Sequence, residues 1–138
     1  MAICSLEEAK PLIISTIQKN LSPVAVVLFG SAAKDRLRPD SDIDIAILTG
    51  DPVEEIVLYR LSQALSHSLN RDVDLIDLSA ASTVFQAQIL STGQVIYCRD
   101  RDRLLAFHAL TLKKYARLNE ERHCIFAAER ERIRAHES

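Results

Sequence analysis

The chain has 138 residues, of which 48% are hydrophobic and 26% are charged, and its formal net charge is −2. This length and apolar content predict one domain with a core of its own, and the slight negative charge argues against a general nucleic-acid-binding protein, which would carry a basic surface. The three cysteines include no C-x-x-C pair, which argues against a disulfide framework and a cysteine-based zinc site.

The first half of the chain predicts one helix and two strands. Ser5, followed three residues later by Glu8, has the form of a capping box and opens a helix that we expect to end near Asn20. Two runs of strand-forming residues follow, at 24–29 and 42–48. Apolar residues recur along one face of the predicted helix, at Leu6, Ala9, Ile13 and Ile17.

The second half predicts alternating helices and strands. In order, we expect a helix that opens at 50–52 and ends near 70, a strand at 73–78, a helix at 82–92 that ends at Gly93, and a short edge strand at 95–97. The apolar residues expected along the first of these helices are Ile56, Tyr59, Leu61 and Leu65. From 101 to 135 no glycine or proline interrupts the helical pattern, which suits one long helix or two.

This alternation predicts an α/β fold with a small mixed β-sheet, helices packed on the sheet and a C-terminal helical extension. We expect residues 1–98 to form the core and residues 99–138 to form the helical extension of the same domain. The N-terminus has no apolar run typical of a secretion signal, and no segment approaches the ~18 apolar residues of a membrane span. We therefore expect a cytoplasmic protein without a membrane partner.

The most informative pattern is Gly30-Ser31, then ten residues, then Asp42-Ile43-Asp44. Alternate residues of a strand share a face, so Asp42 and Asp44 point the same way while Ile43 points to the opposite side. Two carboxylates at about 4 Å repel by roughly 4 kcal/mol at an effective dielectric of about 20, and a bound cation would relieve this repulsion. Oxygen ligands favour Mg²⁺, which commonly binds together with phosphates. The pattern therefore predicts one or two Mg²⁺ ions at the two aspartates, whereas a simple turn would explain only one of these acids.

Gly30 and Ser31 stand where the first predicted strand ends. A glycine lets a phosphate approach the backbone closely, and Ser31 offers a hydroxyl and an N–H at the start of a short helix. No G-K-[ST] follows, so this is not a Walker A loop. A Gly-Ser pair alone is an ordinary turn, but its spacing from the two aspartates predicts a phosphate-binding turn.

The G-S-x10-D-x-D pattern between two strands resembles the nucleotidyltransferase superfamily, whose fold is shared by DNA polymerase beta, poly(A) polymerases and aminoglycoside nucleotidyltransferases. Within it, the chain is similar to the minimal nucleotidyltransferases, specifically the MntA-like antitoxins of HEPN/MNT toxin–antitoxin pairs. The resemblance runs from about Val24 to Cys98 and includes residues 72–78 and 81–84. It implies that residues 1–98 are the nucleotidyltransferase core.

The resemblance implies Mg²⁺-dependent transfer of AMP from ATP, with loss of pyrophosphate, to a tyrosine of a cognate HEPN ribonuclease toxin. This adenylylation would neutralise the toxin, so we expect a hetero-oligomer with the toxin and no DNA partner. Two other hypotheses stay open. An aminoglycoside-type enzyme that modifies a small molecule usually adds a large second domain, whereas only about 40 residues follow Tyr97. A non-catalytic antitoxin that acts by occlusion would be expected to have lost an acid of the motif.

The family also requires a third carboxylate on a neighbouring strand, for which Asp72, Asp74 and Asp77 are the candidates. Asp72 stands at the edge of the predicted strand, while Asp74 and Asp77 point to opposite faces. Asp74 matches the family position. The resemblance therefore implies that Asp74 is a metal ligand or the general base that accepts the proton of the attacking hydroxyl.

Three basic residues lie in the loop between the two halves of the motif: Lys34, Arg36 and Arg38. We expect Lys34 and Arg38 to bind the nucleotide, with a solvated basic loop as the alternative. Relatives often carry glycine where Asp35 stands, which leaves the path of this loop open. Ser82 and Thr83 are further candidates for nucleotide contact, but helix capping is the favoured interpretation.

The C-terminal helical stretch mixes apolar residues with a strongly charged end. Its apolar residues are Leu104, Phe107, Leu110, Leu118, Ile125 and Phe126. We expect part of this stretch to pack on the core and part of it to present a face to the partner protein.

Overall fold

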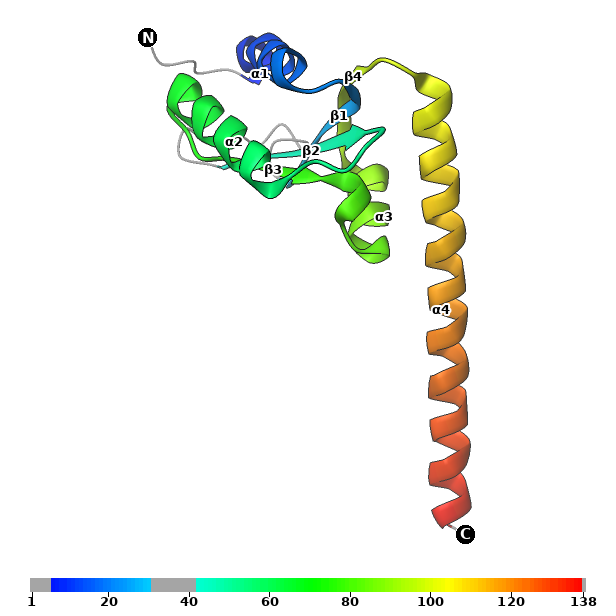
Figure 1. The fold of residues 1–138 in the computed structure, drawn as a ribbon. Helices are drawn as coiled ribbons and strands as arrows, with labels where there is room; N and C mark the ends of the chain where they lie inside the picture. Colours follow the sequence, from blue (N-terminus) through cyan, green and yellow to red (C-terminus); the bar gives the residue numbers. More distant parts are fainter. Residues whose placement is uncertain (1–5, 31–41, 138) are drawn as a thin grey trace.

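The computed structural model describes residues 6–30 and 42–137 of the chain, and Figure 1 shows how their elements are arranged. In chain order these are α1 (Leu6–Asn20), β1 (Pro23–Phe29), β2 (Ile43–Thr49), α2 (Glu55–Leu69), β3 (Val73–Asp77), the short 3-10 helix η2 (Leu78–Ala80), α3 (Thr83–Thr92), β4 (Gln94–Cys98) and α4 (Arg101–Glu137). Each helix and strand predicted within the described residues has its counterpart here, with boundaries that differ by a few residues, whereas the short helix expected from Ser31 lies outside them.

The four strands form one mixed sheet in the order β3-β2-β1-β4. β1 runs antiparallel to both β2 and β4, whereas β2 and β3 run parallel to each other. A parallel pair needs a crossover connection, and α2 supplies it. The predicted α/β fold with a small mixed sheet is therefore confirmed, and β4 is the predicted edge strand.

Alternation along the strands gives the sheet two apolar faces. One face lies against α1 and α2 (Figure 1), and its buried residues are Val26, Leu28, Ile43, Ile45, Ile47, Val73 and Leu75 from the strands with Ala9, Ile13, Ile17, Leu58, Leu61, Leu65 and Leu69 from the helices. The other face, which we call the α3 face, packs against α3 and the first turns of α4; its buried cluster is Val24, Ala25, Val27, Ala46, Leu48, Leu78 and Ile89. Ala46 and Leu48 lie on the α3 face, so Asp44, two residues before Ala46, belongs to it as well.

The start of α2 was predicted incorrectly, and its apolar face was predicted correctly only in part. Residues 50–54 form a loop, and the helix begins at Glu55 after an extended N-cap residue with φ −66° and ψ 141°. Pro52 explains why the helix does not begin at 50–51, because a proline disfavours helical backbone in the residue before it. Leu61 and Leu65 are buried as expected, together with Leu58 and Leu69, whereas Ile56 and Tyr59 are 50% and 61% exposed.

α3 begins as predicted from its capping residue. The Phe85 N–H donates to the Ser82 side-chain oxygen at 3.2 Å, so Ser82 is the N-cap and helix capping is confirmed for it. Gly93 ends the helix with φ −77°, which any residue adopts. A Cβ at Gly93 would stand 2.6 Å from the Val27 side chain, so this glycine is required by close packing on β1.

The C-terminal stretch is a single helix, α4, which decides between the two predicted arrangements. Leu104 and Phe107 pack on the α3 face and Thr111 is buried, after which the helix projects well beyond the core (Figure 1). Leu110, another apolar residue of this stretch, is 50% exposed. The side chains of Ile125 and Phe126 lie outside the part of the chain whose side chains the structure describes. None of the described helices is long and apolar enough to cross a membrane.

Candidate active site

Three carboxylates meet on the α3 face, at the edge of the sheet where β2 and β3 begin. Asp42 directly precedes β2, and Asp44 is the second residue of that strand. The parallel register pairs Asp44 with Asp74 of β3, and paired residues of neighbouring strands share a face. Asp42 and Asp74 are exposed, whereas Asp44 is half-buried between them. The sheet therefore brings together the three acids that the sequence analysis selected.

The electrostatics of this cluster centre on Asp44. Partial burial raises the pKa of the Asp44 carboxyl above its ordinary value, and the negative charges of Asp74 and then Asp42 raise this pKa further. Among the residues that the structure describes, the charges that act on Asp44 are thus those of the two neighbouring carboxylates. A divalent cation among them would reverse these effects, because it favours the ionised form of every acid around it.

The donor set fits Mg²⁺. All three groups are oxygen donors, which this hard cation prefers, and Mg²⁺ is usually held by one or two carboxylates together with water and substrate phosphates. Over the residues that the structure describes, no three His, Cys, Asp or Glu side chains already surround a single point. The cluster is a set of neighbouring carboxylates, two of them exposed.

Gly30 lies beside the cluster in a left-handed conformation, with φ +69°. It follows Phe29, the residue of β1 that pairs with Asp44. A Cβ on Gly30 would stand 2.6 Å from Oδ2 of Asp44, which is too close for any side chain at position 30. The sequence analysis assigned this glycine to phosphate approach, and the structure adds that the space a side chain would take is occupied by the Asp44 carboxylate.

The structure also describes the surroundings of Asp77 and Asp72, the other two acids considered for the third position. Asp77 is 8% exposed and accepts hydrogen bonds from the Ser79 hydroxyl at 2.7 Å, the Ser79 N–H at 3.1 Å and the Val53 N–H at 3.3 Å. Asp77 pairs with Ile47, so it lies on the face opposite to Asp74, as strand alternation predicts. Asp72 is exposed, and its backbone carbonyl accepts from the Ile43 N–H at 2.9 Å.

The loop half of the predicted site lies outside the described residues. This applies to Ser31, Lys34, Arg36 and Arg38, and also to Asp35. Their assignment to the phosphates of the nucleotide stays a prediction from the sequence.

Two aromatic residues beside the acids were not singled out from the sequence. Phe29 of β1 and Phe85 of α3 meet with their ring centroids 5.6 Å apart and their planes at 88°. They lie 56 positions apart in the chain, counting from 29 to 85, and neither belongs to a motif. The register of β1 against β2 places Phe29 opposite Asp44, and Phe85 contacts Phe29.

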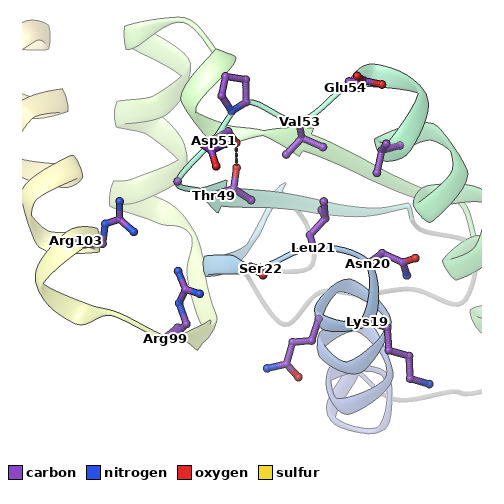
Figure 2. Close-up of a pocket in the computed structure, with 14 residues that line it drawn as sticks. Lys19, Asn20, Leu21, Ser22, Thr49, Asp51, Val53, Glu54, Arg99 and Arg103 are labelled. Atoms are coloured by element: carbon purple, nitrogen blue, oxygen red, sulfur yellow. Dashed lines mark hydrogen bonds between the residues drawn. The ribbon is translucent and has the colours of Figure 1, made fainter.

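A cavity of about 680 Å³ lies elsewhere, at the opposite edge of the sheet (Figure 2). The cavity is lined by the end of α1, the turn after β2 and the beginning of α4. The end of α1 lies beside this turn because β1 starts where β2 ends. Arg99 and Arg103 approach the cavity from one side, and Asp51 and Glu54 line it from the turn after β2. Its described lining includes none of Gly30, Asp42, Asp44 and Asp74, so we take the acid cluster as the candidate active site.

Comparison with known proteins agrees with this geometry. Residues 12–102 match the family described as Polymerase beta, Nucleotidyltransferase. The chain is 36% identical over 114 residues to the protein adenylyltransferase MntA of Shewanella oneidensis, and the match covers 82% of this chain and 81% of that protein.

The solved structures that resemble this chain include toxin–antitoxin complexes. A toxin–antitoxin crystal structure with AMP-PNP contains a chain that matches with a TM-score of 0.77 and 35% identity over 85% of this chain and 94% of that one. A rebuilt and re-refined structure of a tri-AMPylated Shewanella oneidensis HEPN toxin in complex with an MNT antitoxin matches with a TM-score of 0.73 and 33% identity, over 87% and 94%. The chain therefore belongs to the polymerase beta nucleotidyltransferase family and, within it, to the MntA-like minimal nucleotidyltransferases.

Proposed function

We propose that this chain transfers AMP from ATP to a tyrosine hydroxyl of a HEPN-type ribonuclease toxin and thereby silences that toxin. The observation that carries the proposal is the cluster of Asp42, Asp44 and Asp74 on one open face, with the pKa of Asp44 raised by its neighbours. The name of the Shewanella oneidensis relative, an adenylyltransferase, supports the reaction. The solved complex with a tri-AMPylated HEPN toxin supports the acceptor.

The three acids would hold one or two Mg²⁺ ions together with the triphosphate of ATP. When bound, Mg²⁺ neutralises charge on the phosphates and orients them. The chain itself contributes the fixed position of the ligands on β2 and β3, and Gly30 keeps the space beside Asp44 free of a side chain. We assign to Ser31, Lys34 and Arg38 the binding of the phosphates from the loop that follows Gly30.

In the proposed reaction, the tyrosine oxygen attacks the α-phosphorus of ATP. The bond between that phosphorus and the oxygen bridging to the β-phosphate breaks, so pyrophosphate leaves and AMP is joined to the tyrosine. The phenolic proton passes to a carboxylate, for which we assign Asp74. Asp74 is exposed, so an incoming protein side chain can reach it, whereas Asp44 is half-buried.

The partner would complete the site. Asp42 and Asp74 are exposed, so a second protein has direct access to the cluster. We assign residues 1–98 as the nucleotidyltransferase core and residues 99–138 as the helical extension of the same domain, through which the partner docks. Because the reaction consumes ATP and Cys98 is an exposed free thiol, we place it in the cytoplasm.

The decisive experiment incubates the purified chain and its partner with Mg²⁺-ATP and records intact masses. We expect whole AMP increments on the partner, mapped to tyrosine, and none with Asp42→Asn. A partner that is silenced without being modified would establish occlusion instead. Transfer of AMP to an aminoglycoside, with none to the partner, would establish a small-molecule enzyme.

A further inference from the structure

The α3 face carries two aromatic side chains, Phe29 and Phe85, on the same side of the sheet as the acid cluster. Phe29 stands directly opposite Asp44 in the β1–β2 pairing, and directly opposed side chains have their Cβ atoms about 4.5–5.5 Å apart. Phe85 of α3 meets the Phe29 ring in an edge-to-face arrangement with centroids 5.6 Å apart. Phe85 thus contacts the side chain that stands opposite Asp44 in the strand pairing.

The position of Phe85 is fixed by hydrogen bonds rather than by burial. Its own N–H donates to the Ser82 side chain at 3.2 Å. The adjacent Gln86 side-chain amide donates to the Leu78 carbonyl at 2.9 Å and to the Ser79 carbonyl at 3.3 Å. These contacts hold the first turn of α3 to the segment that follows β3, the strand that carries Asp74. The backbone that carries Phe85 is therefore fixed relative to the end of β3.

Phe85 is nevertheless partly open to solvent. It is 36% exposed, and the preceding Val84 is 37% exposed. α3 carries no charged residue in its ten positions, whereas a surface helix normally presents polar or charged residues outward. Val84 and Phe85 therefore form a partly exposed apolar surface, which we call the apolar step, on the same side of the sheet as the three acids.

We propose that Phe85 is the residue on which the base of the nucleotide stacks, with Val84 beside it. This inference rests on the proposed function, because it takes the acid cluster as the place of the phosphates. In a nucleotide a single ribose joins the α-phosphate to the base, so a stacking surface has to lie close to the acids. Phe85 meets this condition, and the flat face of a purine matches an exposed aromatic ring.

The base is a better occupant of this step than the ring of the acceptor tyrosine. An acceptor is held by the surface of a whole partner protein, whereas the base of a small nucleotide depends on what the chain itself provides. Stacking uses the π-face that every base possesses. Phe85 should therefore favour purines over pyrimidines by contact area and should discriminate weakly between ATP and GTP.

The test measures binding of Mg²⁺-ATP and of Mg²⁺-tripolyphosphate to the purified full chain by calorimetry. Phe85→Ala should weaken ATP binding about fivefold to 150-fold, which is the range for loss of one base–aromatic stack, and should leave tripolyphosphate binding unchanged. Phe85→Leu keeps an apolar side chain and should weaken ATP binding similarly, whereas Phe85→Trp should retain it. Tyr59→Ala is the matched control, because it removes an aromatic side chain that is 61% exposed on α2.

Three outcomes separate the alternatives. Equal loss of ATP and tripolyphosphate binding in Phe85→Ala, with lowered thermal stability, would show that the ring only supports the acids. Unchanged ATP binding together with weaker binding of the partner protein would assign the step to the acceptor. Ring-dependent ATP binding without AMP transfer to any tyrosine would reject the proposed acceptor and leave the base-stacking site intact.

Discussion

Asp44 is a carboxylate whose surroundings disfavour its charge. The folded chain raises the pKa of Asp44 above the ordinary value of 3.8, so the folded state binds this proton more tightly than the unfolded state. The free energy of unfolding should therefore fall as pH rises from about 4 through the raised pKa, in the absence of divalent cations. Asp44→Asn should remove this decrease and make the metal-free protein more stable than the wild type at neutral pH. Thermal unfolding in EDTA across this pH range measures it, and a wild-type chain no less stable than Asp44→Asn at pH 7 would contradict the argument.

The individual acids should separate into catalytic and structural groups. Asp74→Asn should lower the turnover rate by about 10²–10⁴-fold, the usual contribution of a general base, without lowering the thermal stability, because it removes a charge that repels Asp44. Asp42→Asn and Asp44→Asn should abolish transfer, because each loses a charged oxygen ligand. Asp77→Asn should retain transfer but lose about 1–3 kcal/mol of stability, since an amide nitrogen would face buried N–H donors. Transfer rates and melting temperatures of all four variants test this division into catalytic and structural acids. A rate loss for Asp77→Asn as large as for Asp74→Asn would show that Asp74 is not the third acid.

Gly30 should tolerate no side chain. Gly30→Ala places a Cβ against the Asp44 carboxylate and keeps a φ of +69°, which costs a non-glycine residue about 1–2 kcal/mol. We expect lower stability and strongly reduced AMP transfer, because relief of the contact displaces Asp44. Gly50→Ala is the matched control: the nearest atom to its Cβ would be Nη2 of Arg103 at 3.5 Å, an ordinary contact. Steady-state kinetics of the two variants should differ accordingly, and equal kinetics would remove the proposed role of Gly30.

At the scale of the elements, α4 has an outer apolar stripe that the core does not use. Leu105 and Leu112 lie seven residues apart on one side of the helix and are 54% and 48% exposed. We predict that Leu105→Glu combined with Leu112→Glu weakens binding of the partner at least tenfold and leaves ATP binding and thermal stability unchanged. Ile56→Glu on α2 is the control, since Ile56 is 50% exposed on a helix that covers the opposite face of the sheet. Weaker partner binding in the Ile56→Glu control alone would indicate that the partner docks on α2 and not on α4.

The sequence determined those features that depend on neighbours along the chain. Strand alternation placed Asp42 and Asp44 on one face, and Ser82 was recognisable as a helix cap. It could not determine the buried face of α2, because two apolar stripes satisfy the helical period and only docking on the sheet selects one of them. The sequence also could not predict that Phe85 contacts Phe29, the residue opposite Asp44. This arrangement depends on the register of β1 against β2 and on how α3 packs.

For the whole molecule, Mg²⁺-ATP should stabilise the fold. A ligand at about 100 times its Kd adds roughly 2.7 kcal/mol to the free energy of unfolding, which should raise the Tm by several degrees. The gain combines direct binding with relief of the repulsion among the three acids. Thermal unfolding with and without Mg²⁺-ATP measures it. An equal shift in the double variant Asp42→Ala/Asp44→Ala would mean that the nucleotide binds elsewhere.

The length of α4 also governs how the free chain behaves in solution. At 1.5 Å per residue its 37 residues span about 55 Å, whereas a compact unit of about 100 residues has a radius of gyration near 13 Å. A monomer of this shape should tumble anisotropically and elute from a sizing column ahead of globular standards of its 15.4 kDa mass. An early elution volume is therefore no sign of a dimer for this protein, and light scattering is the measurement that gives its stoichiometry, alone or with a partner.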